Sequence, residues 1–205
     1  MRRWIVVLSL LLIAAAPAAT HSRMLGDAAI AYSAVRTVTV NGRSYRGMVF
    51  HVPGRDRHEQ EIHGIAEVII LDAAAKRGYL ILPMLKTYVA FAFPTLMADL
   101  DSPALRRSPA GHETVNGERT TKYRIDFTAA NGTRARGFAW LSAQGVLMRI
   151  DGTLTRPGSS KSMKIRMELA NLAIGPQDPT LFRLPPGLVK LPAGALESLL
   201  GAKAG

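Results

Sequence analysis

The sequence contains no cysteine among its 205 residues. That absence excludes disulfide bonds, thiol catalysis, iron–sulfur clusters and cysteine-ligated zinc sites. Aromatic residues make up only 6% of the chain, and 15 acids stand against 26 lysines and arginines. The resulting formal charge of +11 favours anionic partners such as nucleic acid, phospholipid headgroups or acidic glycolipids. Hydrophobic residues amount to 48%, which is enough for the core of one ordinary domain.

The N-terminus has the three parts of a secretory signal peptide. Arg2 and Arg3 supply positive charge, residues 4–16 form an uncharged and almost wholly apolar run, and Ala16-Pro17-Ala18 is a small-x-small cleavage pattern. The run is too short to span a bilayer, which takes about 20 apolar residues. We therefore expect cleavage of residues 1–18 and a mature protein that is soluble in the periplasm. Export argues against nucleic acid as a partner.

The mature chain predicts strands separated by tight turns. Asn-Gly pairs occur at residues 41–42, 116–117 and 131–132, and they favour two-residue hairpin turns because both turn residues adopt positive φ. The pattern predicts a sequential antiparallel meander in one domain, residues 19–192, followed by a tail at residues 193–205. The expected strands are Ile30 to Val40, Ser44 to Val52, Glu59 to Leu71, Tyr79 to Leu82, Lys86 to Phe93, Arg119 to Phe127, Thr133 to Leu141, Val146 to Thr155 and Ser162 to Leu172.

Alternation within the strands predicts one dry face and one wet face. Apolar and charged residues alternate strictly in residues 122–127 and 163–169. The expected fold is mainly β: a single curved antiparallel sheet, incompletely closed, with a short helical lid. Residues 94–105 are expected to form this lid, with Leu96, Met97 and Leu100 covering part of the dry face. The residues expected on the dry face are Phe50, Val68, Ile70, Tyr123, Ile125, Phe127, Trp140, Ile150, Ile165 and Met167.

The dry face has two interpretations that the sequence leaves open. It lines an apolar ligand cavity, or it is the inner side of a fully packed core. The wet face carries dispersed cations, which either are simply solvated or approach anionic headgroups or an acidic partner. The cations are Arg43, Arg46, Arg55, Arg57, Lys122, Arg124, Arg134, Arg136, Lys164 and Arg166.

Candidate chemistry is sparse. His58 and His63 resemble part of a zinc-protease motif, but they are five residues apart in an expected strand, whereas that motif needs a spacing of four on a helix. We interpret them as solvent-facing polar residues. Asp99 and Asp101 have no further oxygen ligands at the spacing of a calcium loop. The sequence therefore predicts a protein without catalytic residues, metal or cofactor.

The order of several short motifs resembles the periplasmic LolA-like superfamily, and more narrowly the DUF4412 and outer-membrane lipoprotein-sorting relatives. The resemblance covers most of residues 28–192. It implies a half-open antiparallel β-barrel with helices in its mouth, and carriage of lipid-modified proteins. The motifs that carry it are Tyr32-Ser33-Ala34, Asn41-Gly42-Arg43-Ser44-Tyr45-Arg46-Gly47, Pro53-Gly54-Arg55-Asp56-Arg57-His58-Glu59, Leu82-Pro83-Met84-Leu85-Lys86-Thr87-Tyr88, Glu113-Thr114-Val115-Asn116-Gly117, Thr121-Lys122-Tyr123, Gly137-Phe138-Ala139-Trp140 and residues 175–187.

Two functional hypotheses follow. The first is a periplasmic, non-catalytic carrier or chaperone for an apolar ligand, either a lipid or the acyl chain of a lipoprotein, with an anionic membrane surface as a further partner. The second is a structural or sensory protein-interaction module of the cell envelope with a packed core. This chain has little mid-chain helix, so its lid is expected to be smaller than that of the family.

Overall fold

The computed structural model describes residues 28–62, 64–92, 106–129 and 132–192. Within these ranges the chain is mostly strand, and its helical elements are two short 3-10 turns, η1 (Pro83–Leu85) and η2 (Pro179–Phe182). The expected signal peptide, the lid residues Leu96, Met97 and Leu100, and the tail at 193–205 lie outside the described residues. The strands are β1 (Tyr32–Val40), β2 (Arg43–Val52), β3 (Arg55–Ile62), β4 (Ile65–Asp72), β5 (Arg77–Leu82), β6 (Thr87–Ala92), β7 (Arg106–Val115), β8 (Glu118–Thr128), β9 (Arg134–Ser142), β10 (Leu147–Thr155), β11 (Ser162–Ile174) and β12 (Val189–Leu191).

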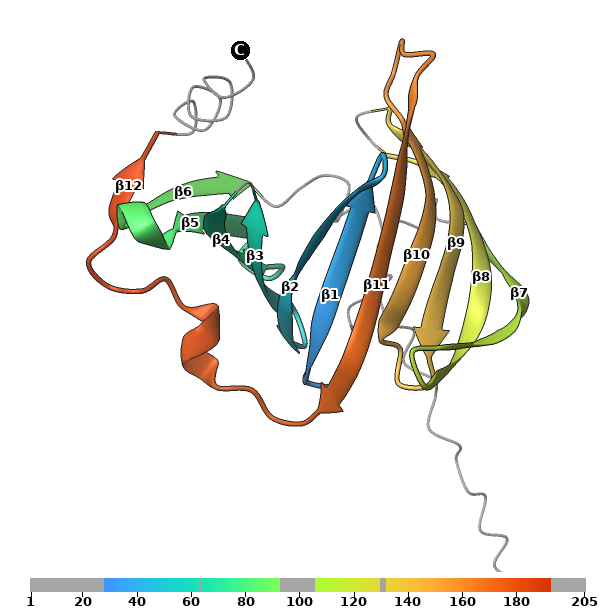
Figure 1. Cartoon of the computed structure of the whole chain (residues 1–205), viewed down its shortest axis with the longest axis horizontal. Coiled ribbons are helices and arrows are strands. Elements are labelled where there is room, and N and C mark those ends of the chain that lie inside the picture. The colour runs from blue at the N-terminus through green and yellow to red at the C-terminus, as the bar shows by residue number, and fades with distance from the viewer. Residues whose placement is uncertain (1–27, 63, 93–105, 130–131, 193–205) are drawn as a thin grey trace, which may run out of the picture.

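All twelve strands belong to one open, curved sheet in the order β12-β6-β5-β4-β3-β2-β1-β11-β10-β9-β8-β7 (Figure 1). The expectation of a mainly β fold with a single curved, incompletely closed sheet is confirmed. Two details differ. The sheet consists of two meanders, β1–β6 and β7–β11, which join where β1 pairs with β11. It is also mixed, because β12 runs parallel to β6.

The turns follow the local chemistry at most positions. Asn41 and Gly42 have φ of 48° and 86°, and Asn116 and Gly117 have 48° and 89°, as the Asn-Gly signal predicts. Asn131 of the third pair lies outside the described residues. The expected single strand from Glu59 to Leu71 was wrong: the chain reverses at Gly64, where φ is 78°, and forms β3 and β4. The apolar residues after this glycine masked the turn.

Glycines mark the places where the sheet bends. A Cβ on Gly47 of β2 would overlap the carbonyl oxygen of Glu59 on β3. Gly137 of β9 and Gly152 of β10 pair with each other, and a Cβ on either would overlap the partner strand's backbone. By the pairing register these three positions point to the same side of the sheet, and we call that side the concave face. The opposite side is the convex face.

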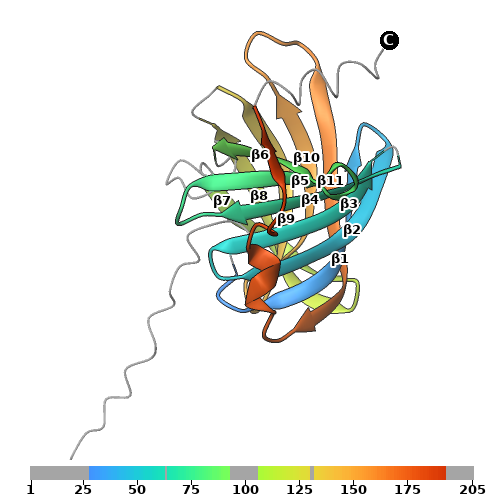
Figure 2. The ribbon, with the colours of Figure 1, turned by 90° about the vertical axis from the view of Figure 1, so that its left-hand side faces the viewer.

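The C-terminal segment, residues 175–188, crosses the outside of the first meander (Figure 2). Leu184 and Leu188 pack against a buried cluster on β4 and β5. The Arg57 side chain on β3 also donates a hydrogen bond of 3.1 Å to the carbonyl oxygen of Leu181. The convex face of the first meander is therefore covered by the chain itself. No helix among the described residues is long and apolar enough to cross a membrane.

The most tightly packed core lies at the end of the sheet where β1 begins. It contains the fully buried Ala28, Val115, Val146 and Met148. The β7–β8 turn reaches over this end, because the Asn116 amide donates a 2.8 Å hydrogen bond to the carbonyl oxygen of Leu169 on β11. Side chains of both meanders thus close this end of the molecule.

Candidate functional site

The concave face of β1, β11, β10, β9 and β8 is apolar at every position of three adjacent rows. The register places these residues side by side across the strands, and two of them are the paired glycines at the bend. Alternate positions of β8, β9, β10 and β11 carry charged residues. The rows are Val38–Met167–Ile150–Ala139–Tyr123, Val40–Ile165–Gly152–Gly137–Ile125 and Met163–Leu154–Ala135–Phe127.

On β10 and β11, burial of the concave face decreases from the core end towards the β10–β11 turn. On β11, Leu169 is 2% exposed, whereas Met167 and Ile165 further along the same face are only half-buried. On β10, Met148 is fully buried and Ile150 is half-buried. The concave face is therefore filled at the end that carries the tight core. Towards the β10–β11 turn, Met167, Ile165 and Ile150 remain partly accessible. On the neighbouring strands β8 and β9, however, Ile125, Phe127 and Ala135 are buried.

On the concave face of the first meander, polar side chains gather around β3, whereas Ile69 and Leu71 of β4 and Leu80 of β5 continue the same face as apolar residues. Asp56, His58 and Gln60 stand at alternate positions of β3, next to Arg36 of β1 and His51 of β2. Arg36 donates a 2.9 Å hydrogen bond to Gln60. The fully buried ring of His51 lies 2.8 Å from Asp56 Oδ1 through Nδ1 and 2.9 Å from the Ala28 carbonyl oxygen through Nε2. The Ala28 carbonyl oxygen can only accept, so Nε2 of the ring is the donor in that hydrogen bond.

Burial lowers the pKa values of His58 and Arg36 among these polar side chains. Desolvation, followed by the positive charge of Arg36, lowers the pKa of His58 to about 3. The His58 ring is therefore neutral at physiological pH, and its Nδ1 is enclosed with no hydrogen-bond partner among the described residues. Desolvation also lowers the pKa of Arg36, although the nearby Asp56 opposes that shift. The sequence prediction of a solvent-facing His58 was wrong, and His63 lies outside the described residues.

The ten residues expected on one dry face divide between the two faces. Six lie on the concave face within the rows above: Tyr123, Ile125, Phe127, Ile150, Ile165 and Met167. Phe50, Val68, Ile70 and Trp140 have the opposite parity and lie on the convex face. Val68 and Ile70 pack with the C-terminal segment there. Both faces of β4 are apolar, so the alternation did not reveal which residues point inward.

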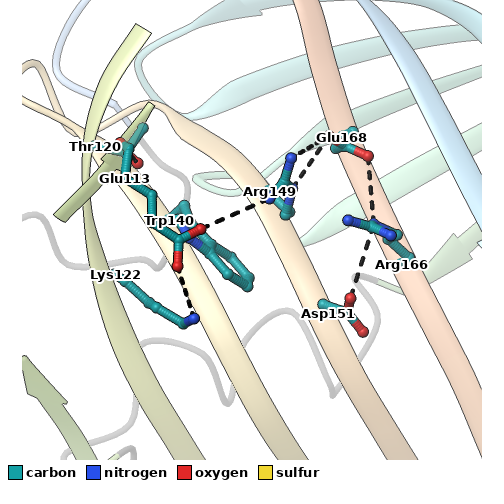
Figure 3. A network of polar contacts seen from close by, with 8 residues as sticks. All are labelled: Glu113, Thr120, Lys122, Trp140, Arg149, Asp151, Arg166 and Glu168. Carbon is teal, nitrogen blue, oxygen red and sulfur yellow. Dashed lines mark hydrogen bonds and ion pairs between the residues drawn. The ribbon is translucent and has the colours of Figure 1, made fainter. Parts of the chain in front are cut away.

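Trp140 is buried on the convex face within a network of charges (Figure 3). Its indole donates a 2.9 Å hydrogen bond to Glu113, which also accepts one of 2.8 Å from Lys122. These hydrogen bonds, first that of Lys122, lower the pKa of Glu113. Lys122 and Arg149 lie 4.9 Å and 5.2 Å from the centroid of the Trp140 ring. The ion pairs continue through Glu168, Arg166 and Asp151.

Most of the predicted wet-face cations do share the convex face. Arg43 is the exception, because it pairs with Val40 and so has the parity of the concave face, although its side chain is exposed at the β1–β2 turn. Cations and acids on this face form ion pairs, such as that of 2.6 Å between Arg149 and Glu168.

A shallow hollow of about 570 Å³ lies beside the β7–β8 turn. It is lined by His112, Glu113, Thr114, Arg119, Thr120, Thr121 and Ala143. Among the described residues, no group of three or more His, Asp or Glu side chains is placed to hold a metal ion.

No protein-family model and no curated protein matches this sequence. Solved structures do resemble its fold. The MucA/MucB complex of Pseudomonas aeruginosa aligns with a TM-score of 0.54 and 13% identity, over 81% of this chain and 60% of that chain. An uncharacterized conserved protein from Thermus thermophilus aligns with a TM-score of 0.54 and 11% identity, over 83% of this chain and 94% of that chain.

A LolA superfamily protein from Nitrosomonas europaea aligns over 80% of this chain and 94% of that chain, with a TM-score of 0.42 and 7% identity. The chain spans about three fifths of the MucB chains that it resembles. At these identities the likeness of this chain to the MucB structures and to the Thermus thermophilus protein concerns the fold alone.

Proposed function

We propose that this protein is an extracytoplasmic, non-catalytic binding protein that carries an apolar ligand, either a lipid or the acyl chain of a lipoprotein, on its concave face. The observation that carries the proposal is the set of three apolar rows on β1 and β8–β11, with charged residues at alternate positions of β8, β9, β10 and β11. Transfer of an acyl chain from water to such a face is favourable by about 0.8 kcal/mol per buried CH₂ group, before the costs of binding.

The half-buried side chains support a ligand rather than a fully packed core. Met167, Ile165 and Ile150 are large and apolar, yet they keep part of their surface accessible next to a buried core. The binding site that we propose comprises the six predicted residues on the concave face, with Val38, Val40, Met163 and Leu154 added from the same rows. Phe50, Val68, Ile70 and Trp140 are left out of it.

A second function is favoured by one comparison. One structure similar in fold is MucB in complex with MucA(peri), at a TM-score of 0.50. By analogy, the alternative is a protein-interaction module of the cell envelope, in which the sheet or its rim contacts a protein partner. An exported location, which both alternatives require, rests on the N-terminal signal-peptide pattern.

Binding of an apolar fluorescent probe, together with lipid extraction and native mass spectrometry of the purified protein, tests the carrier. Folded wild-type protein is expected to co-purify with lipid or to bind the probe. Ile165→Glu places a carboxylate among apolar rows and should weaken probe binding about tenfold or more. Arg166→Glu, one residue along on the convex face, is the matched control and should leave probe binding unchanged.

Ile165→Glu also destabilises a plain packed core, so unfolding free energies are measured beside binding. Met167→Ala is the milder variant: a bound ligand can fill the space it opens, so the stability loss should be smaller with ligand than without. A folded wild-type protein that neither carries lipid nor binds the probe would overturn the carrier and leave the protein-interaction module.

A further inference from the structure

Three turns meet at the end of the sheet opposite the tight core. The β1–β2 turn and the β10–β11 turn are joined by two hydrogen bonds between Asn41 and Lys164, of 3.0 Å and 2.9 Å. The β8–β9 turn touches the same hairpin, since a Cβ on Gly132 would lie 2.7 Å from Pro157 Cγ. In Figure 1 the β1–β2 turn and the long β10–β11 hairpin point to the same side of the molecule.

The described residues of this end are strongly and almost uniformly basic. Residues 40–46, 126–136 without 130–131, and 153–164 contain one acid, Asp126. Arg134 and Arg136 share that acid at 3.5 Å and 3.0 Å. We call the exposed cations of these ranges the basic rim: Arg43, Arg46, Arg134, Arg136, Arg156, Lys161 and Lys164.

The other end of the second meander has a different charge pattern. Around the β7–β8 turn, Glu113 and Glu118 accompany Arg119, and Glu113 is held by Lys122 and Trp140. Charge is therefore distributed unevenly along the strand direction. The basic rim lies at the end towards which the concave side chains of β10 and β11 become half-buried, whereas the balanced end coincides with the closed core.

We propose that the basic rim docks on an anionic lipid bilayer and turns the accessible end of the concave face towards the headgroups. Phosphate and carboxylate groups of anionic lipids attract clustered lysines and arginines. In the described part of the rim, seven cations stand against one acid, Asp126, which pairs with Arg134 and Arg136. The tip of the β10–β11 hairpin, residues 156–161, consists of small and polar residues beside its two cations, so the attachment is electrostatic rather than inserted. This orientation would serve ligand transfer at a membrane, and that part of the proposal rests on the proposed carrier function.

Vesicle co-sedimentation of the mature full-length protein tests the rim. Vesicles contain phosphatidylcholine alone, or phosphatidylcholine with phosphatidylglycerol. We expect binding only to the anionic vesicles, and its loss in about 1 M NaCl, where the Debye length falls to about 3 Å. Lys161→Glu/Lys164→Glu should weaken binding about tenfold or more. The matched control, Lys76→Glu/Arg119→Glu, makes the same change of net charge at exposed positions away from the rim and should bind within about twofold of wild type.

Equal binding of wild-type protein to neutral and anionic vesicles would overturn the proposal that the basic rim docks on anionic lipid. Equal weakening by the two double variants would overturn it as well, because net charge alone would then explain the binding. Probe binding in solution separates this proposal from the carrier. The Lys161→Glu/Lys164→Glu variant should keep wild-type probe affinity. Vesicle docking without any probe or lipid binding would overturn the carrier alone, and probe binding without anionic selectivity would overturn the rim alone.

Discussion

At the scale of single residues, the half-buried His58, whose Nδ1 is enclosed, makes stability depend on pH. Its folded pKa of about 3 lies below the ordinary value of 6.5, so between these values the unfolded chain binds a proton that the folded chain does not. Its contribution is complete above about pH 6.5 and is lost as the pH falls towards 3, by about 1.4 kcal/mol per pH unit within that window.

Urea unfolding of wild type and His58→Phe at pH 7 and pH 4.5 measures this effect. The phenyl ring does not titrate and removes an enclosed nitrogen that has no hydrogen-bond partner in the described part of the chain. The variant should match or exceed wild type at pH 7 and lose less stability at pH 4.5. Arg36, Asp56 and His51 face the same ring and are unchanged in both proteins, so their own titration largely cancels. Equal acid losses in the two proteins would contradict a His58 that is neutral in the folded protein.

Gly47 is a second residue with a predictable effect. Its missing side chain lets β3 bend sharply over β2, because a Cβ there would overlap the carbonyl oxygen of Glu59. The obstacle is backbone and cannot rotate away, so Gly47→Ala should destabilise the fold by about 3 kcal/mol or more. Arg46→Ala, exposed on the same strand, should stay within about 0.5 kcal/mol of wild type in chemical denaturation. Similar small losses in both variants would show that the bend can relax.

At the scale of elements, the C-terminal segment completes the first meander. Leu184 and Leu188 cover Val68, Ile70 and Ile81 on the convex face. The double variant Leu184→Ala/Leu188→Ala should lower the unfolding free energy by about 2–5 kcal/mol. That is the range for one fully buried leucine, and we apply it to the pair because each of the two side chains is half-buried. Hydrogen exchange should rise in β3–β6 more than in β8–β11. A uniform rise across both meanders would mean that the segment stabilises the whole sheet equally.

At the scale of the whole molecule, the β1–β11 pairing is the seam that joins the two meanders. Proline cannot donate to a sheet ladder and is tolerated mainly at edges, as Pro109 is in the edge strand β7. Val38→Pro in this central strand should therefore abolish cooperative folding. Val38→Ala keeps the ladder and should only lower the unfolding free energy by about 1–3 kcal/mol. Circular dichroism and thermal melts distinguish them, and a cooperative melt of Val38→Pro would refute the role of the seam.

The hairpin turns and the side-chain alternation of this fold could be predicted from the sequence alone. Asn41-Gly42 and Asn116-Gly117 specify hairpins through positive φ, and alternation in residues 122–127 and 163–169 separates the apolar Ile125, Ile165 and Met167 from charged neighbours. Turn geometry and side-chain parity depend only on residues next to one another in the chain. That is why a single curved, open sheet could be predicted, together with six residues of the concave rows.

Long-range packing decided the rest. Val68 and Ile70 lie on the convex face because residues 175–188, a hundred positions later, return to cover them. Trp140 is buried on the convex face, where Glu113, Lys122 and Arg149 of other strands surround its ring. The small Gly137 and Ala139 occupy the concave positions next to it. His58 became a neutral residue with an enclosed Nδ1 only through the neighbours that β1 and β2 bring to it. The local sequence determined which residues alternate along each strand. Where both faces of a strand are apolar, the face that lies on the concave side depends on contacts that exist only in the folded sheet.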